Sequence, residues 1–297
     1  MNIQWFPGHM AKTRRLIAEN LKLVDVVIEL LDARIPRSSK NPEIDGLINN
    51  KPKVVVLNKS DLADEAVSRE WSRWYNAKGE SHIFIDSIKG KGIPELKATL
   101  RNIMKEKLER EKEKGRIFRP IRTMVVGIPN VGKSSFINKI AGKASAVTGD
   151  KPGVTRGKQW IRLNEEIELL DTPGILWPKF DDEQVGFNLA FTGAIKDDIM
   201  DTGEIAAVLL AKLSETYPKN LMERFKFQSL EDMDGLKLLE TAGKKRGCII
   251  SGGEIDYSRI SSIVLDEFRG GKIGRISLEK PEQEKKEETN PQDQINE

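Results

Sequence analysis

The sequence has little of what disulfide-bonded, zinc-binding and membrane-spanning proteins require. Its 297 residues include one cysteine, Cys248, and two histidines, which excludes a disulfide framework and a clustered Cys/His zinc site. No apolar run approaches the ~18 residues needed to span a membrane. The first ten residues lack the basic stretch and apolar core of a secretion signal. The composition therefore predicts a soluble, cytoplasmic protein with no membrane partner.

The net charge of the chain is also small, but positive and negative residues are unevenly distributed along it. The formal net charge is +3, which by itself argues against a nucleic-acid partner. Residues 1–180 nevertheless carry +11, whereas residues 181–280 and 281–297 carry −4 each. The basic residues 1–180 are therefore compatible with a nucleic-acid partner, although the net charge of the whole chain does not indicate one.

Residues 1–178 alternate short runs rich in Val, Ile and Leu with longer amphipathic runs. This alternation predicts an α/β domain with a mostly parallel, doubly wound sheet. The expected strands are Val24–Leu31, Lys53–Asn58, His82–Asp86, Arg122–Gly127, Gln159–Leu163 and Ile167–Asp171. The expected helices are Ala11–Lys22, Glu65–Ala77, Ile93–Lys114 and Lys133–Ala141.

The pattern changes in residues 179–280, where apolar residues recur at helical spacing and strand-like runs disappear. This part predicts a small all-helical domain. Its expected helices are Val185–Ala194, Glu204–Leu213, Leu221–Phe225, Gly235–Thr241 and Ser258–Phe268. Residues 281–297 contain many Glu, Lys, Gln and Asn residues and no aromatic ones, so they predict a disordered acidic tail.

Residues 127–134 match the phosphate-binding pattern G-x-x-x-x-G-K-S between an expected strand and an expected helix. Gly127 and Gly132 allow the backbone to curl so that its N–H groups point at phosphate oxygens. Lys133 would reach the β- and γ-phosphates, and the Ser134 hydroxyl would bind Mg²⁺. The candidate nucleotide contacts in this loop are Asn130, Val131, Gly132, Lys133, Ser134 and Ser135.

Residues 58–61 fit the pattern N-K-x-D and directly follow an expected strand. Guanine presents two donors on one edge, and a carboxylate at Asp61 can accept both, whereas adenine offers an acceptor there. A base that leaves such polar groups unpaired is rejected strongly. Asn58, Lys59 and Asp61 alone could form an ordinary surface turn, but together with the phosphate loop they predict a GTP site.

Three further elements complete the motif set. Asp171 ends an expected strand and begins D-T-P-G, so it could hold Mg²⁺ through water while the Gly174 N–H meets the γ-phosphate. Thr155 is the candidate switch threonine and a candidate Mg²⁺ ligand. Asp86 and Ser87 follow another strand and could supply contacts to the base.

These are the motifs of translation-factor-like GTPases in a rotated order, with N-K-x-D ahead of the phosphate loop. With Trp-Phe-Pro-Gly-His-Met at residues 5–10, the chain closely resembles the ribosome biogenesis GTPase A family (YlqF/RbgA), a circularly permuted GTPase family, over residues 2–280. The resemblance implies a monomeric GTP hydrolase that uses GTP/GDP and Mg²⁺. It also implies binding to rRNA, and to ribosomal proteins, of the large-subunit precursor during late assembly, with hydrolysis stimulated by that particle.

The residue that positions the attacking water is not the usual one. Ile175 occupies the place after D-x-x-G where many GTPases have Gln, so intrinsic hydrolysis should be slow. The rotated topology and the resemblance point to His9, although a loop histidine that only docks the N-terminus is the alternative. The candidate catalytic residues are therefore His9, Lys133, Thr155 and Gly174.

The resemblance also makes Asn130 a candidate potassium ligand, and an Asn suited to turn geometry is an equally good interpretation. Basic spots at Lys105–Arg122, Lys244–Arg246 and Arg269–Arg275 are candidate RNA contacts, and each alone is more often ordinary surface. Two rival functions stay open: an RNA-binding scaffold that holds GTP without turnover, and a GTPase that signals to a protein or membrane partner.

Overall fold

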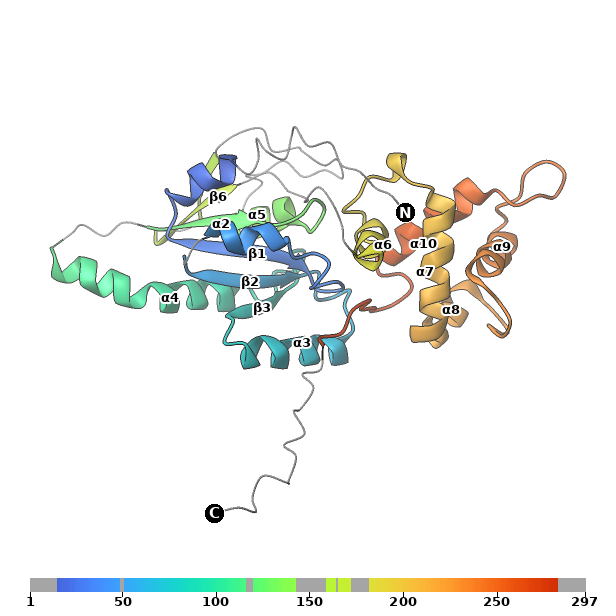
Figure 1. Cartoon of the computed structure of the whole chain (residues 1–297), viewed down its shortest axis with the longest axis horizontal. Helices are drawn as coiled ribbons and strands as arrows, with labels where there is room; N and C mark the ends of the chain where they lie inside the picture. The colour runs from blue at the N-terminus through green and yellow to red at the C-terminus, as the bar shows by residue number, and fades with distance from the viewer. Residues whose placement is uncertain are drawn as a thin grey trace, which may run out of the picture.

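The computed structural model describes residues 15–48, 51–115, 120–142, 159–163, 165–171 and 182–282. In this part of the chain a sheet with strand order β3-β2-β1-β4-β6-β5 lies beside a group of helices (Figure 1). The strands are β1 (Val26–Asp32), β2 (Lys53–Asn58), β3 (His82–Ile85), β4 (Ile121–Val126), β5 (Gln159–Arg162) and β6 (Ile167–Asp171). All neighbouring pairs are parallel except β5 with β6. The doubly wound α/β prediction is confirmed.

Both faces of the sheet are covered, which explains the nearly continuous apolar strands. All seven residues of β1 are buried. Ile28 and Leu30 pack into the core formed with α4 (Ile93–Glu113) and α5 (Lys133–Ala141). Val27 and Leu31 face the opposite side, toward helical residues 15–21, α2 (Pro42–Ile48) and α3 (Glu65–Ala77). Each such side chain contributes about 1.5–3 kcal/mol when fully buried.

The short helix α2 was not expected from the apolar pattern. It is only seven residues long, and Pro42 occupies its first position. The Asn41 side chain accepts a hydrogen bond from the Glu43 N–H at 3.0 Å, which stabilises the helix start. A local cap and a proline at the first helical position therefore create an element too short for periodicity to reveal.

Residues 182–282 contain the expected helices, each beginning at or before its predicted start. They are α6 (Glu183–Phe191), α7 (Thr202–Thr216), α8 (Pro218–Phe225), α9 (Gly235–Lys245) and α10 (Tyr257–Arg269). Aspartates cap four of them, and each accepts first-turn N–H groups: Asp182, Asp201, Asp234 and Asp256. Capped first turns are polar, so apolar spacing alone places most of the starts too late. Helix α7 packs against α9 and α10, and its Leu209 and Leu210 are buried in the core that these helices share.

The chain leaves α10 and returns to the sheet, where residues 275–282 lie near α3 (Figure 1, red). The predicted boundary at residue 178 and nearly all of the predicted tail 281–297 fall outside the described residues, and they stay predictions. Among the helices that the structure describes, none has the length and hydropathy to cross a bilayer.

Two helical glycines provide a matched test of this packing. A Cβ on Gly235, at the start of α9, would lie 2.2 Å from the Ala207 carbonyl oxygen of α7, whereas one on Gly46 in α2 meets nothing within 4 Å. We expect Gly235→Ala to lower the free energy of unfolding by about 1–3 kcal/mol because the two helices must separate. Gly46→Ala should leave it unchanged or raise it by about 0.5–1 kcal/mol. Urea unfolding measures both; equal effects would contradict the close α7–α9 contact.

Candidate nucleotide site

The motif-bearing loops gather at one edge of the sheet. Successive strands β1, β2 and β3 extend the sheet in one direction, and β4 with β6 extends it in the other. The loops after β1 and β4 therefore flank the point where the strand order reverses, which is where open α/β sheets bind ligands. The phosphate loop follows β4, and the N-K-x-D loop follows β2.

The phosphate loop makes a tight turn between β4 and α5. Gly132 has φ 96°, and a Cβ there would lie 2.5 Å from the Asn58 side-chain nitrogen. A Cβ on Gly127 would lie 2.5 Å from the Leu30 carbonyl oxygen. Lys133 Nζ donates to the loop carbonyls of Gly127 (3.1 Å) and Ile128 (2.6 Å). The close backbone and the N-terminus of α5 fit a bound phosphate chain.

Asn58 holds three of the motif loops together. Its Nδ2 donates to the Val131 carbonyl in the phosphate loop at 2.9 Å. Its Oδ1 accepts from the Ser87 hydroxyl and, at 3.3 Å, from the Ser87 N–H. Asp86 in turn accepts from the N–H groups of Ile88 and Lys89, both at 2.9 Å. Asn58, Asp86 and Ser87 are buried, so these bonds fix the loops after β2 and β3 against the phosphate loop.

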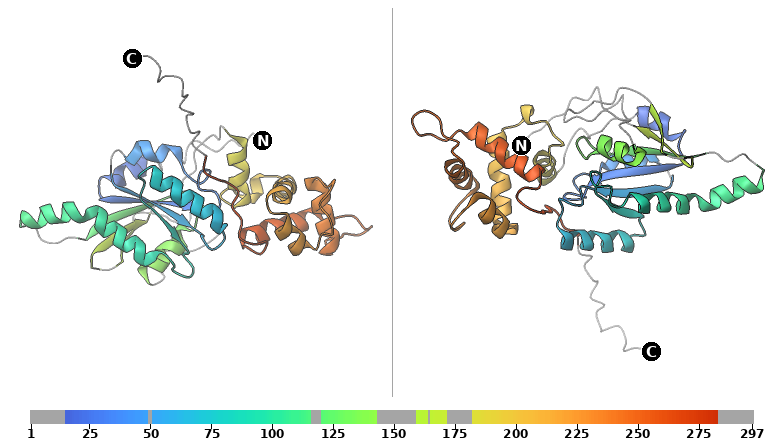
Figure 2. Two further views of the ribbon diagram at one scale, coloured as in Figure 1. Left: turned by 90° about the horizontal axis from the view of Figure 1, so that it is seen from below. Right: turned by 180° about the vertical axis from the view of Figure 1, so that it is seen from behind.

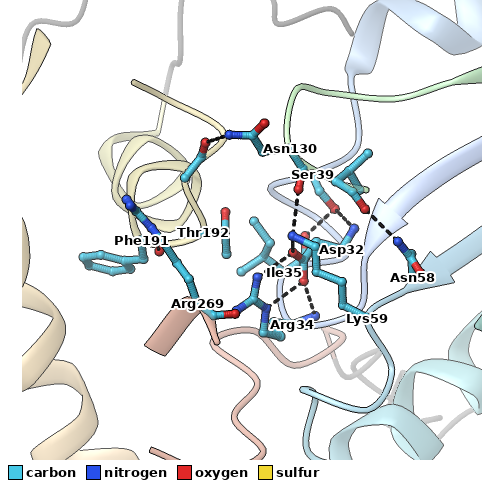
Figure 3. Close-up of polar contacts among 12 residues, drawn as sticks. Asp32, Arg34, Ile35, Ser39, Asn58, Lys59, Asn130, Phe191, Thr192 and Arg269 are labelled. Carbon is cyan, nitrogen blue, oxygen red and sulfur yellow. Dashed lines mark hydrogen bonds and ion pairs between the residues drawn. The ribbon is translucent and has the colours of Figure 1, made fainter. Parts of the chain in front are cut away.

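Lys59 lies between the N-K-x-D loop and the phosphate loop. Its backbone is left-handed with φ 58°, and its Nζ donates to the Asn130 carbonyl at 2.7 Å. The same Nζ lies 3.1 Å from Asp32 Oδ2. Figure 3 shows Lys59, Asp32 and Asn130 converging at the carboxyl ends of the strands.

Asp32, the last residue of β1, forms a buried ion pair with Arg34. Arg34 Nε and Nη2 donate to the two carboxylate oxygens at 3.0 and 2.8 Å, and the Arg34 N–H adds a third bond at 3.0 Å. The two side chains are only 2% and 1% exposed. Burial acts to raise the pKa of Asp32, but the charges of Arg34 and Lys59 outweigh it and hold this pKa well below its usual range. The carboxylate is therefore ionised at neutral pH.

Helices α6 and α10 reach this cluster directly. Arg34 lies with its guanidinium 5.1 Å from the Phe268 ring centroid, and Nη1 donates to the Phe268 carbonyl at 3.4 Å. Asn130 Nδ2 donates to the Gly193 carbonyl, just after α6, at 2.6 Å. Arg269 joins the ends of the two helices, because it donates to the carbonyls of Phe191 and Ala190 at 3.1 and 2.9 Å (Figure 3).

The structure thus brings together much of the predicted pocket and leaves part of it undescribed. Asn58, Lys59, Asn130, Val131, Gly132 and Lys133 form one connected cluster, with Ser134 and Ser135 in the first turn of α5. Asp61 lies in the loop after Lys59. His9, Thr155 and Gly174 lie outside the described residues, and of Asp171 only the backbone at the end of β6 is described. The predicted Mg²⁺ set of Ser134, Thr155 and Asp171 therefore stays a prediction.

The residues that sequence reasoning missed are Asp32, Arg34 and Arg269. Asp-Ala-Arg directly after an apolar strand was a visible signal, since charged residues there lie at the ligand-binding edge of a parallel sheet. Arg269, predicted as a candidate RNA contact, instead forms a bidentate pair with Asp197 at 2.7 and 2.8 Å. Its charge is used inside the protein.

Known proteins resemble the chain over nearly its whole length. Residues 122–246 match the family model described as 50S ribosome-binding GTPase. Proteins named Ribosome biogenesis GTPase A are 50% identical in Bacillus cereus, with 95% of each chain covered, and 31% identical in Thermotoga maritima, with 94% of this chain and 95% of that one covered. The GDP-bound structure of T. maritima YlqF has a TM-score of 0.64 and 27% identity and covers 91% of this chain and 100% of that one.

Replacing Arg34 tests the buried pair. Arg34→Met leaves the Asp32 carboxylate buried with Lys59 as its remaining cation, so we expect a loss of about 3–5 kcal/mol in unfolding free energy at pH 7. In the wild type, the stabilisation from the lowered Asp32 pKa is present above the ordinary carboxyl pKa of about 3.9 and is lost as the pH falls further. In the variant the native pKa of Asp32 rises toward or above the unfolded value, so Asp32 contributes less to acid destabilisation. The stability difference between wild type and variant should therefore be largest near neutral pH and narrow as the pH falls below about 3.9.

Urea unfolding between pH 3 and pH 8 measures both effects. Arg15→Met is the control, because Arg15 forms an exposed pair with Glu19, and exposed pairs contribute little. An Arg34→Met protein as stable as the control would contradict a structural role for the buried pair.

Proposed function

The chain belongs to the ribosome biogenesis GTPase A family, and from this premise we propose that it hydrolyses GTP on a precursor of the large ribosomal subunit during late assembly. The observation that carries the nucleotide part is the Asn58 cluster, which joins the guanine-binding pattern to the phosphate loop at the strand-order reversal. The family membership makes the protein a GTP hydrolase that acts in ribosome biogenesis. The particle, its rRNA and its ribosomal proteins are the finer part of the proposal, as are a cytoplasmic location and a monomeric state.

In this proposal each motif has a defined task. Asp61 accepts hydrogen bonds from the two guanine donors, and Lys59 connects the N-K-x-D loop to the phosphate loop through the Asn130 carbonyl. Lys133 exchanges its bonds to Gly127 and Ile128 for phosphate oxygens. Ser134, with Thr155 and Asp171, would hold Mg²⁺, which neutralises charge on the β- and γ-phosphates. The N–H of Gly174 would meet the γ-phosphate.

His9 is the proposed residue that orients the attacking water, because Ile175 offers no hydrogen-bonding group. An imidazole titrates near neutral pH, so it can orient water or accept its proton. Potassium is a further proposal. A potassium ion would bind the Asn130 side-chain oxygen, because an amide nitrogen is a donor and not a cation ligand; here that nitrogen donates to the Gly193 carbonyl.

Two separate basic areas are proposed to meet rRNA, one on α4 and one on α9, at opposite ends of the molecule (Figure 1). The buried residues of α4 end at Met104, and the rest of the helix extends beyond the sheet (Figure 2). This extension exposes Lys105, Arg110, Lys112 and Lys114, and α9 exposes Lys244 and Lys245. Glutamates alternate with the basic residues of α4, so the contact would be moderate and dependent on salt.

Co-sedimentation with large-subunit particles tests the proposed partner. We expect binding with a non-hydrolysable GTP analogue that weakens at least severalfold with GDP and falls as salt rises, because phosphate contacts release counterions. Binding without any GTP hydrolysis would favour the scaffold alternative. Absence of binding at low salt in either nucleotide state would contradict the proposal and favour a different partner.

Substituting His9 tests the proposed catalytic role. His9→Ala should leave the affinity for GTP unchanged and lower particle-stimulated turnover by about 10²–10⁴-fold, the usual contribution of a positioned acid or base. The measurement is phosphate release with and without particles at saturating GTP. His82→Ala is the control, since His82 hydrogen-bonds Ser72 and stacks on Tyr75 away from the motif loops. If His9→Ala retained full particle-stimulated turnover, the proposed catalytic role of His9 would be contradicted.

A further inference from the structure

A segment from the end of the chain lies across the loops that build the base pocket. We define the C-terminal strap as residues 275–279, which follow α10 and reach the loops after β1 and β2 (Figure 1, red; Figure 2). Ile276, Ser277 and Leu278 are buried there. The strap is thus packed against the sheet edge that carries the N-K-x-D motif.

One side of the strap binds the backbone of residues 60–64, which contain Asp61. Arg275 Nε donates to the Ala63 carbonyl at 2.8 Å, and Nη2 donates to the Ser60 carbonyl at 3.1 Å. The Ile276 N–H donates to the Leu62 carbonyl at 2.8 Å. The Asp64 N–H donates to the Ser277 hydroxyl at 3.1 Å. Strap residues therefore hold the loop on both sides of Asp61.

The other side of the strap binds the loop after β1. The Leu278 N–H donates to the Arg34 carbonyl at 2.9 Å. The Glu279 carboxylate accepts from the N–H groups of Arg37 and Ser38 at 2.8 and 3.1 Å, and from Asn188 Nδ2 of α6 at 2.9 Å. The strap consequently ties the base-pocket loop to Arg34 and to the helical region.

The loop around Asp61 has few backbone bonds of its own. The Leu62 N–H donates to the Lys59 carbonyl at 2.9 Å, and the Ser60 N–H donates to the Ile85 carbonyl at 3.1 Å. Base discrimination depends on the placement of a carboxylate to within a fraction of an ångström. A loop that receives its remaining bonds from a distant segment is placed by that segment.

We propose that the C-terminal strap, through Arg275, positions Asp61 and thereby sets the selectivity of the pocket for guanine. Arg275 is a positioning residue, since it contacts the loop backbone and not the base. The inference rests on the proposed role of Asp61 in reading guanine. It adds that displacement of the helical region, to which the strap is attached, would weaken the placement of Asp61.

Comparing GTP with ITP isolates this role. Inosine lacks the 2-amino group, so the difference in affinity between the two nucleotides reports how well Asp61 is placed. Arg275→Ala should weaken GTP binding about fivefold, the equivalent of roughly one hydrogen bond, and ITP binding much less. Arg275→Lys, which keeps one donor group, should lie between. Arg259→Ala is the matched control, because Arg259 is exposed on α10 away from the motif loops.

The measured quantity is the ratio of GTP affinity to ITP affinity. Equilibrium binding of fluorescent GTP and ITP to the full chain gives this ratio, and thermal unfolding checks that each variant is folded. Ser277→Ala, which removes only the acceptor for the Asp64 N–H, serves if Arg275→Ala does not fold, and should narrow the ratio in the same direction. Parallel loss of GTP and ITP affinity, or an unchanged ratio in folded variants, would overturn the inference.

The variant Asp61→Asn distinguishes failure of the strap proposal from failure of the proposed guanine-reading role of Asp61. If Asp61 reads guanine, this variant loses its preference for GTP and accepts xanthosine triphosphate, whose 2-oxo group suits an amide donor. If Asp61→Asn changes its preference to xanthosine triphosphate but Arg275→Ala keeps the wild-type ratio of GTP to ITP affinity, only the proposed role of the strap is overturned. An Asp61→Asn protein that binds GTP like the wild type would overturn the proposed pocket.

Discussion

The buried pair of Asp32 and Arg34 is the interaction on which the nucleotide site and the helical region both depend. Removing two charges from water costs several kcal/mol for each ion, and only good geometry offsets this cost. Here three hydrogen bonds join the pair, and Lys59 adds a second cation. The Arg34 guanidinium also lies over the Phe268 ring and donates to the Phe268 carbonyl. Each partner thus limits where the others can lie.

The position of the pair gives it this influence. Asp32 ends β1, the strand that pairs with both β2 and β4, next to the point where the strand order reverses. Lys59 connects it to the phosphate loop through the Asn130 carbonyl. The Asn130 side chain reaches Gly193 after α6. A shift of the helical region is therefore transmitted to backbone that would bind phosphate and base.

Local patterns in the sequence were sufficient for the strands and most of the described helices, because strand burial on two faces and helix amphipathicity impose short-range patterns. They were insufficient for α2, whose start depends on a single Asn41 cap. They also could not pair Arg34 with Phe268, which lies 234 positions away, or Arg275 with Ala63. Such contacts arise only when the helical region folds back onto the sheet, and nothing in the local spacing encodes that return.

The helical region holds the motif loops from two directions, which makes its position and the state of the pocket interdependent. From one side Gly193 binds the phosphate loop, and from the other the strap binds the loop that carries Asp61. Polar contacts of 2.6–3.1 Å are lost over small displacements. If these loops bind nucleotide as proposed, a partner that moves the helices would alter nucleotide affinity, and by linkage the nucleotide would alter affinity for that partner by the same factor. In a chain whose N-K-x-D loop precedes its phosphate loop, the strap is the connection that brings the end of α10 back to the N-K-x-D loop.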